Sequence, residues 1–177
     1  DVYSKLLQDE VNRINHLVEQ ILLFANPKPS KIEEINILDI IKMSIKLEKF
    51  QFQNKNVKIV ENLPEKGVII KGDREKLREV FSNILMNSYE AVNEKEDGLI
   101  EISVKESNNK VEVLISDNGH GIKKEIKDKI FDPFFTTKEK GTGLGLSIVL
   151  KIIEEHKGKI RIESEENKGT KVFVEFP

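Results

Sequence analysis

The chain has 177 residues, which is enough for one substantial hydrophobic core with or without an appended element. Its 29 basic residues against 31 acidic ones leave a formal net charge of −2, so charge gives no support for nucleic-acid binding, which usually needs a basic excess. The absence of cysteine excludes disulfides, thiolate metal sites and cysteine nucleophiles. No apolar run reaches the roughly 20 residues of a membrane span. The sequence starts at Asp1 in the middle of a helical pattern and without a signal segment, so we interpret it as a fragment of a longer protein.

The first 27 residues predict a helix with one apolar stripe. Its apolar positions alternate between four-residue and three-residue steps, the spacing of a helix that packs against other helices, at Leu7, Val11, Ile14, Val18, Ile21 and Ala25. The sequence "NPKP" at 26–29 ends the pattern. A core helix of the same domain is the alternative, but the proline stop favours a separate element, such as part of a helical bundle. We therefore predict a boundary between residues 1–27 and 28–177.

Residues 28–177 alternate between helical and strand patterns. We predict a helix over 37–52 and strands over 57–63 and 68–72. Asp73 is a good N-cap for a long helix. One face of that helix is apolar and carries Leu77, Val80, Phe81, Ile84, Leu85, Ser88 and Val92.

The second half of the chain predicts two hairpins. The alternating runs at 99–106 and 110–116 are joined by the turn-like "SNN". The runs at 159–165 and 170–176 are joined around "NKG", and they close the chain. Between the hairpins, residues 147–155 predict a helix that follows a cluster of glycines.

Glycines concentrate between positions 119 and 145. The sequence "SDNGHGI" at 116–122 follows a strand pattern, and taken alone it indicates a tight turn. The sequence "GTGLGLSIV" at 141–149 places three glycines ahead of a helix, where free backbone N–H groups favour a phosphate. Its spacing is neither the dinucleotide fingerprint nor a P-loop, and a flexible hinge stays open as the alternative.

Two asparagines lie one turn apart near the edge of the apolar face of the long helix. Asn87 lies at the margin of that face, and Asn83 lies slightly further round. An asparagine oxygen there can bind Mg²⁺ without burying a charge, since Mg²⁺ takes one such ligand together with phosphate oxygens and water. For the pair alone, two half-exposed helix amides remain the simpler interpretation.

Taken together, four ordered motifs resemble the boxes of the ATP-binding domain of sensor histidine kinases. They are "NILMN" at 83–87, "DNGHGI" at 117–122, "FDPFFTTK" at 131–138 and "GTGLGL" at 141–146, and the resemblance covers about 31–177. It implies an α+β fold: a two-layer α/β sandwich of the Bergerat type in the GHKL superfamily, with a mixed sheet, helices on one face and a long helix ahead of it. Type II topoisomerases, mismatch-repair ATPases and a heat-shock chaperone share that fold.

The resemblance implies a role for each matching residue. Asp117 would accept a hydrogen bond from the adenine amino group, with Thr170 nearby. Asn87 would coordinate Mg²⁺ beside Asn83, and Lys138 would reach the phosphates of ATP. The other implied nucleotide-binding residues are Gly119, Gly121, Ile122, Gly141, Thr142, Gly143, Leu144, Gly145 and Leu146.

One pair of positions departs from the family pattern, and one segment is expected to move. Many relatives carry a basic residue and a tyrosine where this chain has Glu90 and Ala91, which shifts the phosphate contact toward Lys138. The segment 122–140 would form a mobile lid over the nucleotide, with its base anchored by Phe131, Phe134 and Phe135.

The implied activity is phosphoryl transfer from ATP to a histidine. Related ATPases have a glutamate base where this chain has Asn83, so transfer is favoured over hydrolysis. The acceptor histidine is expected outside this chain, because His16, on what resembles the second dimerisation helix, lacks the acceptor motif, and so do His120 and His156. The implied partners are a response regulator receiver domain and the protein's own dimerisation domain in a homodimer. We expect a cytoplasmic location, with membrane anchoring of the parent chain left open. The alternatives are a nucleotide-sensing module without transfer activity and a GHKL-type ATPase.

Overall fold

A computed structural model describes residues 3, 4, 7, 8, 10, 11, 14, 15, 18, 21, 22, 29–52, 57–138 and 141–177. From residue 29 the elements follow in the order β1 (Glu33–Asn36), α2 (Ile37–Gln51), β2 (Lys58–Asn62), β3 (Ile69–Gly72), α3 (Arg74–Val92), β4 (Leu99–Ser107), β5 (Lys110–Asp117), the short 3₁₀ helix η1 (Lys124–Lys129), α4 (Gly145–Glu155), β6 (Lys159–Glu165) and β7 (Gly169–Phe176).

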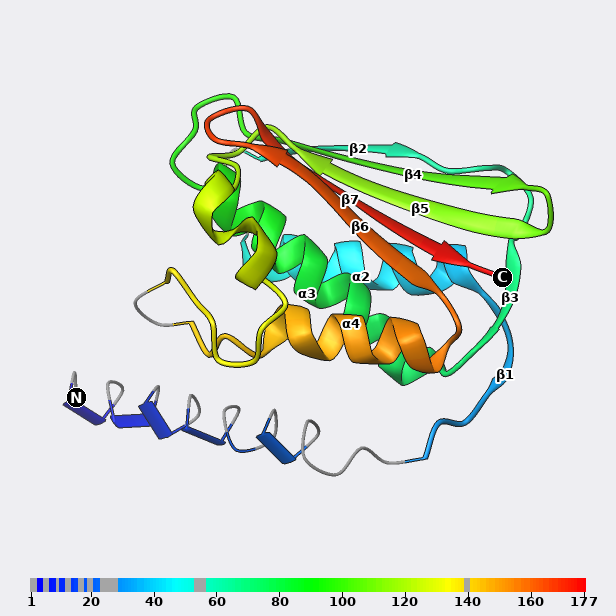
Figure 1. Cartoon of the computed structure of the whole chain (residues 1–177), viewed down its shortest axis with the longest axis horizontal. Helices are drawn as coiled ribbons and strands as arrows, with labels where there is room; N and C mark the ends of the chain where they lie inside the picture. Colours follow the sequence, from blue (N-terminus) through cyan, green and yellow to red (C-terminus); the bar gives the residue numbers. More distant parts are fainter. Residues whose placement is uncertain are drawn as a thin grey trace.

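The fold has two layers. Five strands form a sheet in the order β2-β4-β5-β7-β6, in which β2 and β4 are parallel and the other neighbours are antiparallel. The helices α2, α3 and α4 cover one face of this sheet (Figure 1). The predicted sandwich with a mixed sheet and helices on one face is therefore confirmed. A further pair, β1 and β3, forms a small antiparallel sheet in which Ile35 lies opposite Ile70.

The core lies between the sheet and the helices α2, α3 and α4, with α3 contributing one whole face. The buried side chains of α3 are Leu77, Val80, Phe81, Ile84, Leu85, Ser88, Tyr89 and Val92, which is the predicted face with Tyr89 added. Alternate residues of β4, β5 and β7 meet this face, and they include Ile102, Ile115 and Val174. Each such side chain contributes roughly 1.5–3 kcal/mol on burial, so the sheet and α3 hold the site in place.

Two tight turns close the predicted hairpins. Asn108 and Asn109 have φ angles of 51° and 59°, as in the two-residue turns whose twist matches that of the strands. Asn167, with φ 62°, lies in the turn between β6 and β7. Both predicted hairpins are present, and α4 starts at Gly145, two residues earlier than the pattern indicates.

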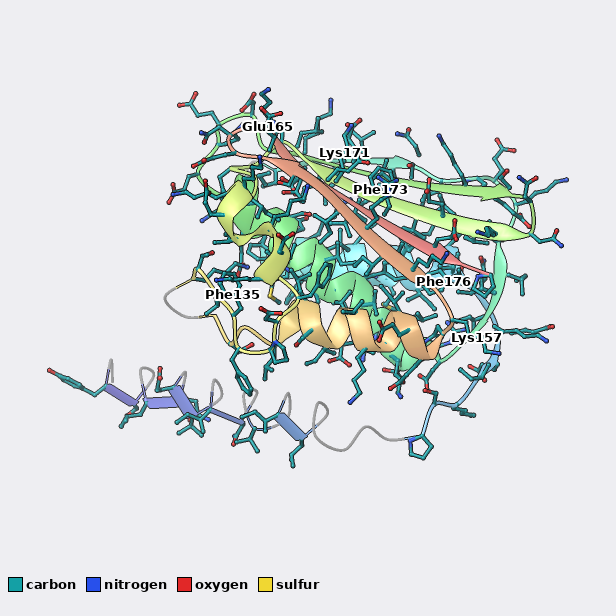
Figure 2. The ribbon with its side chains drawn as sticks, in the orientation of Figure 1. Phe135, Lys157, Glu165, Lys171, Phe173 and Phe176 are labelled. Carbon is teal, nitrogen blue, oxygen red and sulfur yellow. The ribbon has the colours of Figure 1, made fainter. Side chains whose placement is uncertain are left out.

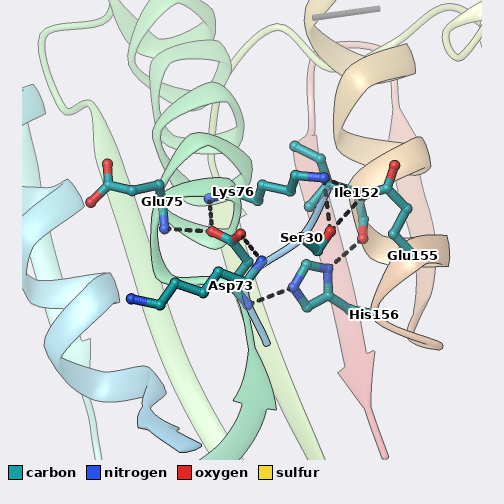
Figure 3. A network of polar contacts seen from close by, with 8 residues as sticks. Ser30, Asp73, Glu75, Lys76, Ile152, Glu155 and His156 are labelled. Carbon is teal, nitrogen blue, oxygen red and sulfur yellow. Dashed lines mark hydrogen bonds and ion pairs between the residues drawn. The ribbon is translucent and has the colours of Figure 1, made fainter. Parts of the chain in front are cut away.

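A polar network joins the chain entering β1 to the start of α3 and the end of α4 (Figure 3). Asp73 caps α3, because its Oδ1 accepts the N–H groups of Glu75 and Lys76, both at 3.1 Å. Its Oδ2 accepts the N–H of Lys31 at 2.7 Å. The Lys76 ammonium donates to Glu155 at 2.7 Å and to the Ser30 hydroxyl at 2.8 Å. The network thus fixes where the chain enters this layer.

His156 belongs to the same network. Its Nε2 accepts the backbone N–H of Asp73 at 2.9 Å, and its Nδ1 lies 2.7 Å from the carbonyl oxygen of Ile152. Those two contacts need a neutral ring with the proton on Nδ1. The histidine closes α4, as its position in the sequence indicates, and it is buried and has a structural role.

The described residues between 3 and 22 are helical, and their apolar side chains are exposed. Leu7, Val11, Ile14 and Val18 expose 68%, 52%, 52% and 48% of their surface, so this stripe is not part of the core. Ala25 and His16 lie outside the described residues, and the boundary after residue 27 stays a prediction. In the part of the chain that the structure describes, every helix is too short or too polar to cross a membrane.

Candidate functional site

A cavity of about 340 Å³ lies between α3, the end of β5, the segment 130–138 and the start of α4. The four sequence motifs, far apart along the chain, all contribute to its wall. The predicted site residues that line it are Asn83, Asn87, Asp117, Gly121, Ile122, Lys138, Gly141, Thr142, Gly143, Gly145, Leu146 and Thr170.

Two predicted residues are not among those that line the cavity. Gly119 uses its N–H to bind Asp117 Oδ1 at 2.9 Å. Leu144 is fully buried, and its N–H donates to the hydroxyl of Thr142 at 3.2 Å. The backbone of Leu144 is therefore engaged within its own loop in this structure, and Gly119 acts by holding the aspartate.

Asp117, the last residue of β5, is 7% exposed and firmly held. Its Oδ1 accepts the N–H groups of Gly119 and Thr170, the latter at 3.2 Å across the β5–β7 pair. Burial raises the pKa of the Asp117 carboxyl, and hydrogen bonds from Gly119, Ser88 and Thr170 only partly oppose that rise. Both backbone donors use Oδ1 and Ser88 adds one side-chain hydrogen bond, so the carboxylate, which can accept about four hydrogen bonds, keeps capacity to accept one from a ligand.

The side chains predicted to handle phosphate and metal come together on α3. Asn87 Oδ1 accepts a hydrogen bond from the Lys138 ammonium at 2.7 Å. The same ammonium forms an ion pair with Glu90. Asn83 donates to the carbonyl oxygen of Glu79 at 3.0 Å, and its Oδ1 lies 2.8 Å from where a Cβ on Gly145 would lie. Asn83 thus faces the start of α4.

Two glycines adopt backbone angles that other residues disfavour. Gly121 and Gly143 have φ angles of 67° and 69°. The turn at Gly121 carries Ile122 into position for its N–H to bind the Ser164 hydroxyl at 2.8 Å. The carbonyl oxygen of Gly143 accepts the N–H of Phe134 at 2.9 Å, which joins the glycine loop to the segment that precedes it.

The predicted lid contains η1 and an irregular segment, and its last predicted residues, 139 and 140, lie outside the described part of the chain. Phe135 is half-buried and lines the cavity from this segment (Figure 2), and Phe131 is also half-buried.

The prediction that Phe134 anchors the lid is wrong, because Phe134 is 62% exposed. With φ at 67°, its backbone turns to bind Gly143 and the ring stays in solvent. Ile130, which is 9% exposed, is an apolar anchor that the sequence analysis did not identify.

Three polar residues of the site were not predicted. Ser88 hydrogen-bonds Asp117, and a serine on an otherwise apolar helix face was the available signal. Ser164 binds the N–H of Ile122, the carbonyl oxygen of Gly169 at 2.9 Å and the hydroxyl of Thr170 at 2.9 Å, but nothing in its alternating strand distinguished it. Glu90 was noted only as a departure from relatives, and its pairing with Lys138 depends on the path of the lid.

The residues present fit a metal that is bound mainly through a nucleotide. Among the described residues, no three histidine, aspartate or glutamate side chains gather into a metal-binding cluster. Asn87 offers one neutral oxygen at the cavity wall. Mg²⁺ commonly takes one or two protein ligands and completes its shell with phosphate oxygens and water, so a lone amide oxygen suits it.

Comparison with known proteins identifies the chain's relatives. Sporulation kinase A of Bacillus subtilis is 32% identical over 99% of this chain and 29% of its own length, and sporulation kinase C of the same organism is 35% identical over 99% of this chain and 41% of its own length. The sensor histidine kinase ZraS of Salmonella typhimurium is 32% identical over 98% of this chain and 37% of its own length. The chain therefore spans less than half the length of these curated relatives.

Solved structures and a family match agree with these relatives. The catalytic domain of histidine kinase ThkA has a TM-score of 0.74 and 36% identity, over 83% of this chain and 95% of that domain. ThkA in complex with the response regulator TrrA has a TM-score of 0.81 and 31% identity, over 99% of this chain and 50% of that one. Residues 72–177 match the family described as histidine kinase-, DNA gyrase B- and HSP90-like ATPase. The chain belongs to this family, and its ATP-binding fold is that of a histidine kinase catalytic domain.

Proposed function

We propose that this chain binds ATP with Mg²⁺ and transfers the γ-phosphoryl group to a histidine on a dimerisation helix outside the chain, for relay to a response regulator receiver domain. The observation that carries the proposal is the convergence of Asp117, Asn87 and Lys138 on one cavity. These three residues come from three separate motifs, and each offers a different kind of contact to a nucleotide.

Base recognition is assigned to the Asp117 end of the cavity. Two backbone N–H groups and the Ser88 side chain fix the carboxylate, which keeps capacity to accept a hydrogen bond from a donor such as the adenine amino group. The hydroxyl of Thr170, held by Ser164, lies on the neighbouring strand and supports the same edge of the base. A fixed acceptor loses little entropy on binding, and this favours one base over others.

Phosphate handling is assigned to the Asn87 end. The Lys138 ammonium supplies positive charge, and the start of α4 after the glycine loop supplies backbone donors and a favourable helix dipole. Bound magnesium would neutralise phosphate charge, with Asn87 as its protein ligand. Positioning and charge stabilisation account for most of the catalysis of phosphoryl transfer, and these groups provide both.

The side chain of Asn83 favours transfer over hydrolysis. It faces Gly145 from α3, where related ATPases are expected to carry a glutamate base. A neutral amide does not take a proton from water, so water at this site stays a poor nucleophile. A neutral histidine imidazole needs no such base, because it is nucleophilic by itself.

The partners in the proposal follow from the N-terminal stripe and from the relatives. We infer that the exposed apolar residues between 7 and 21 face the protein's own dimerisation domain in a homodimer, since heptad spacing suits helix pairing. The response regulator partner is inferred from the ThkA–TrrA complex. We also propose a cytoplasmic site of action, because transfer from ATP needs the nucleotide pool of the cell.

The test is a transfer assay with labelled ATP. The chain is incubated alone and with the dimerisation domain of its parent protein, and acid-labile phosphate is followed. We expect label on the added domain only, and slow release of free phosphate. Nucleotide binding without any transfer would favour a sensing module, and rapid phosphate release without an acceptor would favour an ATPase. Label on His16 would contradict the assignment of that residue.

A further inference from the structure

Lys138 is held at two points on α3 by side chains one turn apart. Its ammonium donates to Asn87 Oδ1 at 2.7 Å and pairs with the carboxylate of Glu90. Residues three apart on a helix lie on the same face, so the two oxygens form one acceptor site for a cation. The lysine belongs to the lid segment, about 50 residues away along the chain. The contact therefore ties the lid to the helix that forms the cavity wall.

The oxygen that holds Lys138 is the one we assign to magnesium. An ammonium and a divalent cation repel each other strongly at such short range, so they cannot both sit against Asn87 Oδ1. When magnesium binds there, Lys138 must move away, and the phosphates of the nucleotide offer it new partners. Lys138 thus binds Asn87 and Glu90 before nucleotide arrives and binds the phosphates afterwards.

We propose that Glu90 is a positioning residue that retains Lys138 on α3 until a nucleotide arrives with its metal. The inference deepens the proposed function and rests on it. Glu90 also lines the cavity, where its carboxylate offsets the positive charge with which Lys138 would otherwise attract phosphates that carry no metal. A nucleotide that brings magnesium to Asn87 would release the lysine from α3. Glu90 therefore makes the site selective for metal-bound nucleotide over free nucleotide.

We call the contact of Lys138 with Asn87 and Glu90 the tether, and no local contact described below holds the lid segment on α3 in its place. Within the lid segment, the N–H of Lys138 donates to the hydroxyl of Thr136 at 3.1 Å, which shapes the chain locally. The N–H of Phe134 binds the glycine loop and does not reach α3. The Lys138 and Glu90 side chains are 43% and 39% exposed, so their pair is modest in strength and can open when ligand binds.

The first test follows hydrogen exchange of the 177-residue chain without nucleotide. Glu90→Gln and Lys138→Met should each speed exchange in peptides covering 131–138 by about threefold, the factor expected for a partly exposed ion pair. The double variant should exchange no faster than either single one. Glu175→Gln is the matched control, because it breaks the similarly exposed Lys110–Glu175 pair away from the lid. Unchanged exchange in Glu90→Gln, or additive effects in the double variant, would overturn the tether.

The second test compares ATP binding in excess Mg²⁺ with binding in a chelator, by calorimetry. Glu90→Gln should bind metal-free ATP about threefold to tenfold more tightly and Mg²⁺-ATP within about twofold of the original chain, so the preference for metal shrinks. An unchanged preference would overturn the inference even if exchange responds as expected. If the original chain binds no nucleotide, the proposed function fails, while the exchange experiment still decides whether Glu90 holds Lys138.

Discussion

Asp73 directly follows β3 and Asp117 is the last residue of β5, and they are almost equally buried at 9% and 7% exposure, yet their pKa values move in opposite directions. Burial raises the pKa of Asp73, but the backbone N–H groups of Lys31, Lys76 and Glu75 and the charge of Lys76 outweigh it, so the pKa ends below its usual value. At Asp117 burial is the dominant influence, and the pKa ends above its usual value.

The two pKa shifts distinguish two ends of the helical layer. The end at Asp73 is structural, and the end at Asp117 binds ligand. Both oxygens of Asp73 accept backbone N–H groups, so its charge stabilises the fold. Both backbone donors to Asp117 use one oxygen, so its charge is only partly compensated before a ligand arrives. Binding sites often give up some stability in this way, because groups that await a ligand cannot be fully satisfied by the protein.

The largest effect is expected from Asp117→Asn on ATP affinity. The amide keeps an oxygen for Gly119 and Thr170, but it presents an N–H group where we place the adenine amino group. We expect affinity to fall about 10-fold to 100-fold, since hydrogen bonds to charged groups contribute roughly 1.5–3 kcal/mol. Calorimetry measures the loss, with Asp128→Asn on the exposed surface of η1 as the matched control. Unchanged affinity would show that Asp117 does not contact the base.

Asp73→Ala tests the structural end of the helical layer, at the start of α3. It removes the cap of α3 and the bond to Lys31, and we expect the free energy of unfolding to fall by about 2 kcal/mol. ATP affinity should stay within about twofold, because the cavity lies at the far end of α3. Urea denaturation measures the loss, and Asp39→Ala, an exposed acid in the first turn of α2, is the control. A large loss of ATP affinity with little loss of stability would reverse the roles of the two ends.

The ion pairs of Lys76 and Lys138 extend the comparison, because one lies at each end of the helical layer. Lys76 and its partner Glu155 have side chains 16% and 28% exposed, whereas Lys138 and Glu90 are 43% and 39% exposed. We expect Lys76→Met to lower the free energy of unfolding by about 1 kcal/mol and Lys138→Met by less than about 0.5 kcal/mol, because solvent screens the second pair more. Thermal and urea unfolding of the two variants give the ranking. Equal losses would mean that the Lys138 pair stabilises the fold as much as the structural network does.

The smallest effect concerns the pH dependence of stability. Since the folded pKa of Asp73 is lowered, its contribution is present at neutral pH and is lost as pH falls through about 4 and below. Asp117 has a raised folded pKa, so its contribution to stability is present at low pH and is lost as pH rises through that raised pKa. At pH 7 we expect Asp73→Asn to destabilise and Asp117→Asn to stabilise, each by about 0.5 kcal/mol. Unfolding measured at pH 7 and near pH 3 should show both differences shrink in acid; differences that persist there would argue against titration as their cause.

Most of the fold was predictable because its strands alternate and its longest helix is amphipathic. Asp73 was recognised as a cap from its residue type and place. The strand β1 was missed, since "EEIN" has no alternation and becomes a strand only by pairing with β3. The 3₁₀ helix η1 was missed because a run of charged residues with no apolar face gives no periodic signal.

The site was predictable as a set of motifs but less so as contacts. Glycines and polar residues in four short segments indicated which positions gather around one cavity. The exposure of Phe134 was not predictable, because it follows from a positive φ that its composition gives no reason to expect. The engagement of Leu144 with Thr142 and the pairing of Lys138 with Glu90 depend on loop paths, which local sequence does not determine.

The pairing of β5 with β7 brings Asp117 opposite Thr170, 53 residues later, and the lid and α4 lie between them. In a chain that folds this way, the entropy of closing the intervening loop grows only with the logarithm of its length, so doubling a flexible loop costs roughly 0.6 kcal/mol. The central strands therefore tolerate insertions and deletions in the lid at small cost to folding. The aspartate at the end of β5 stays in register while the segment over the cavity is free to change length and composition.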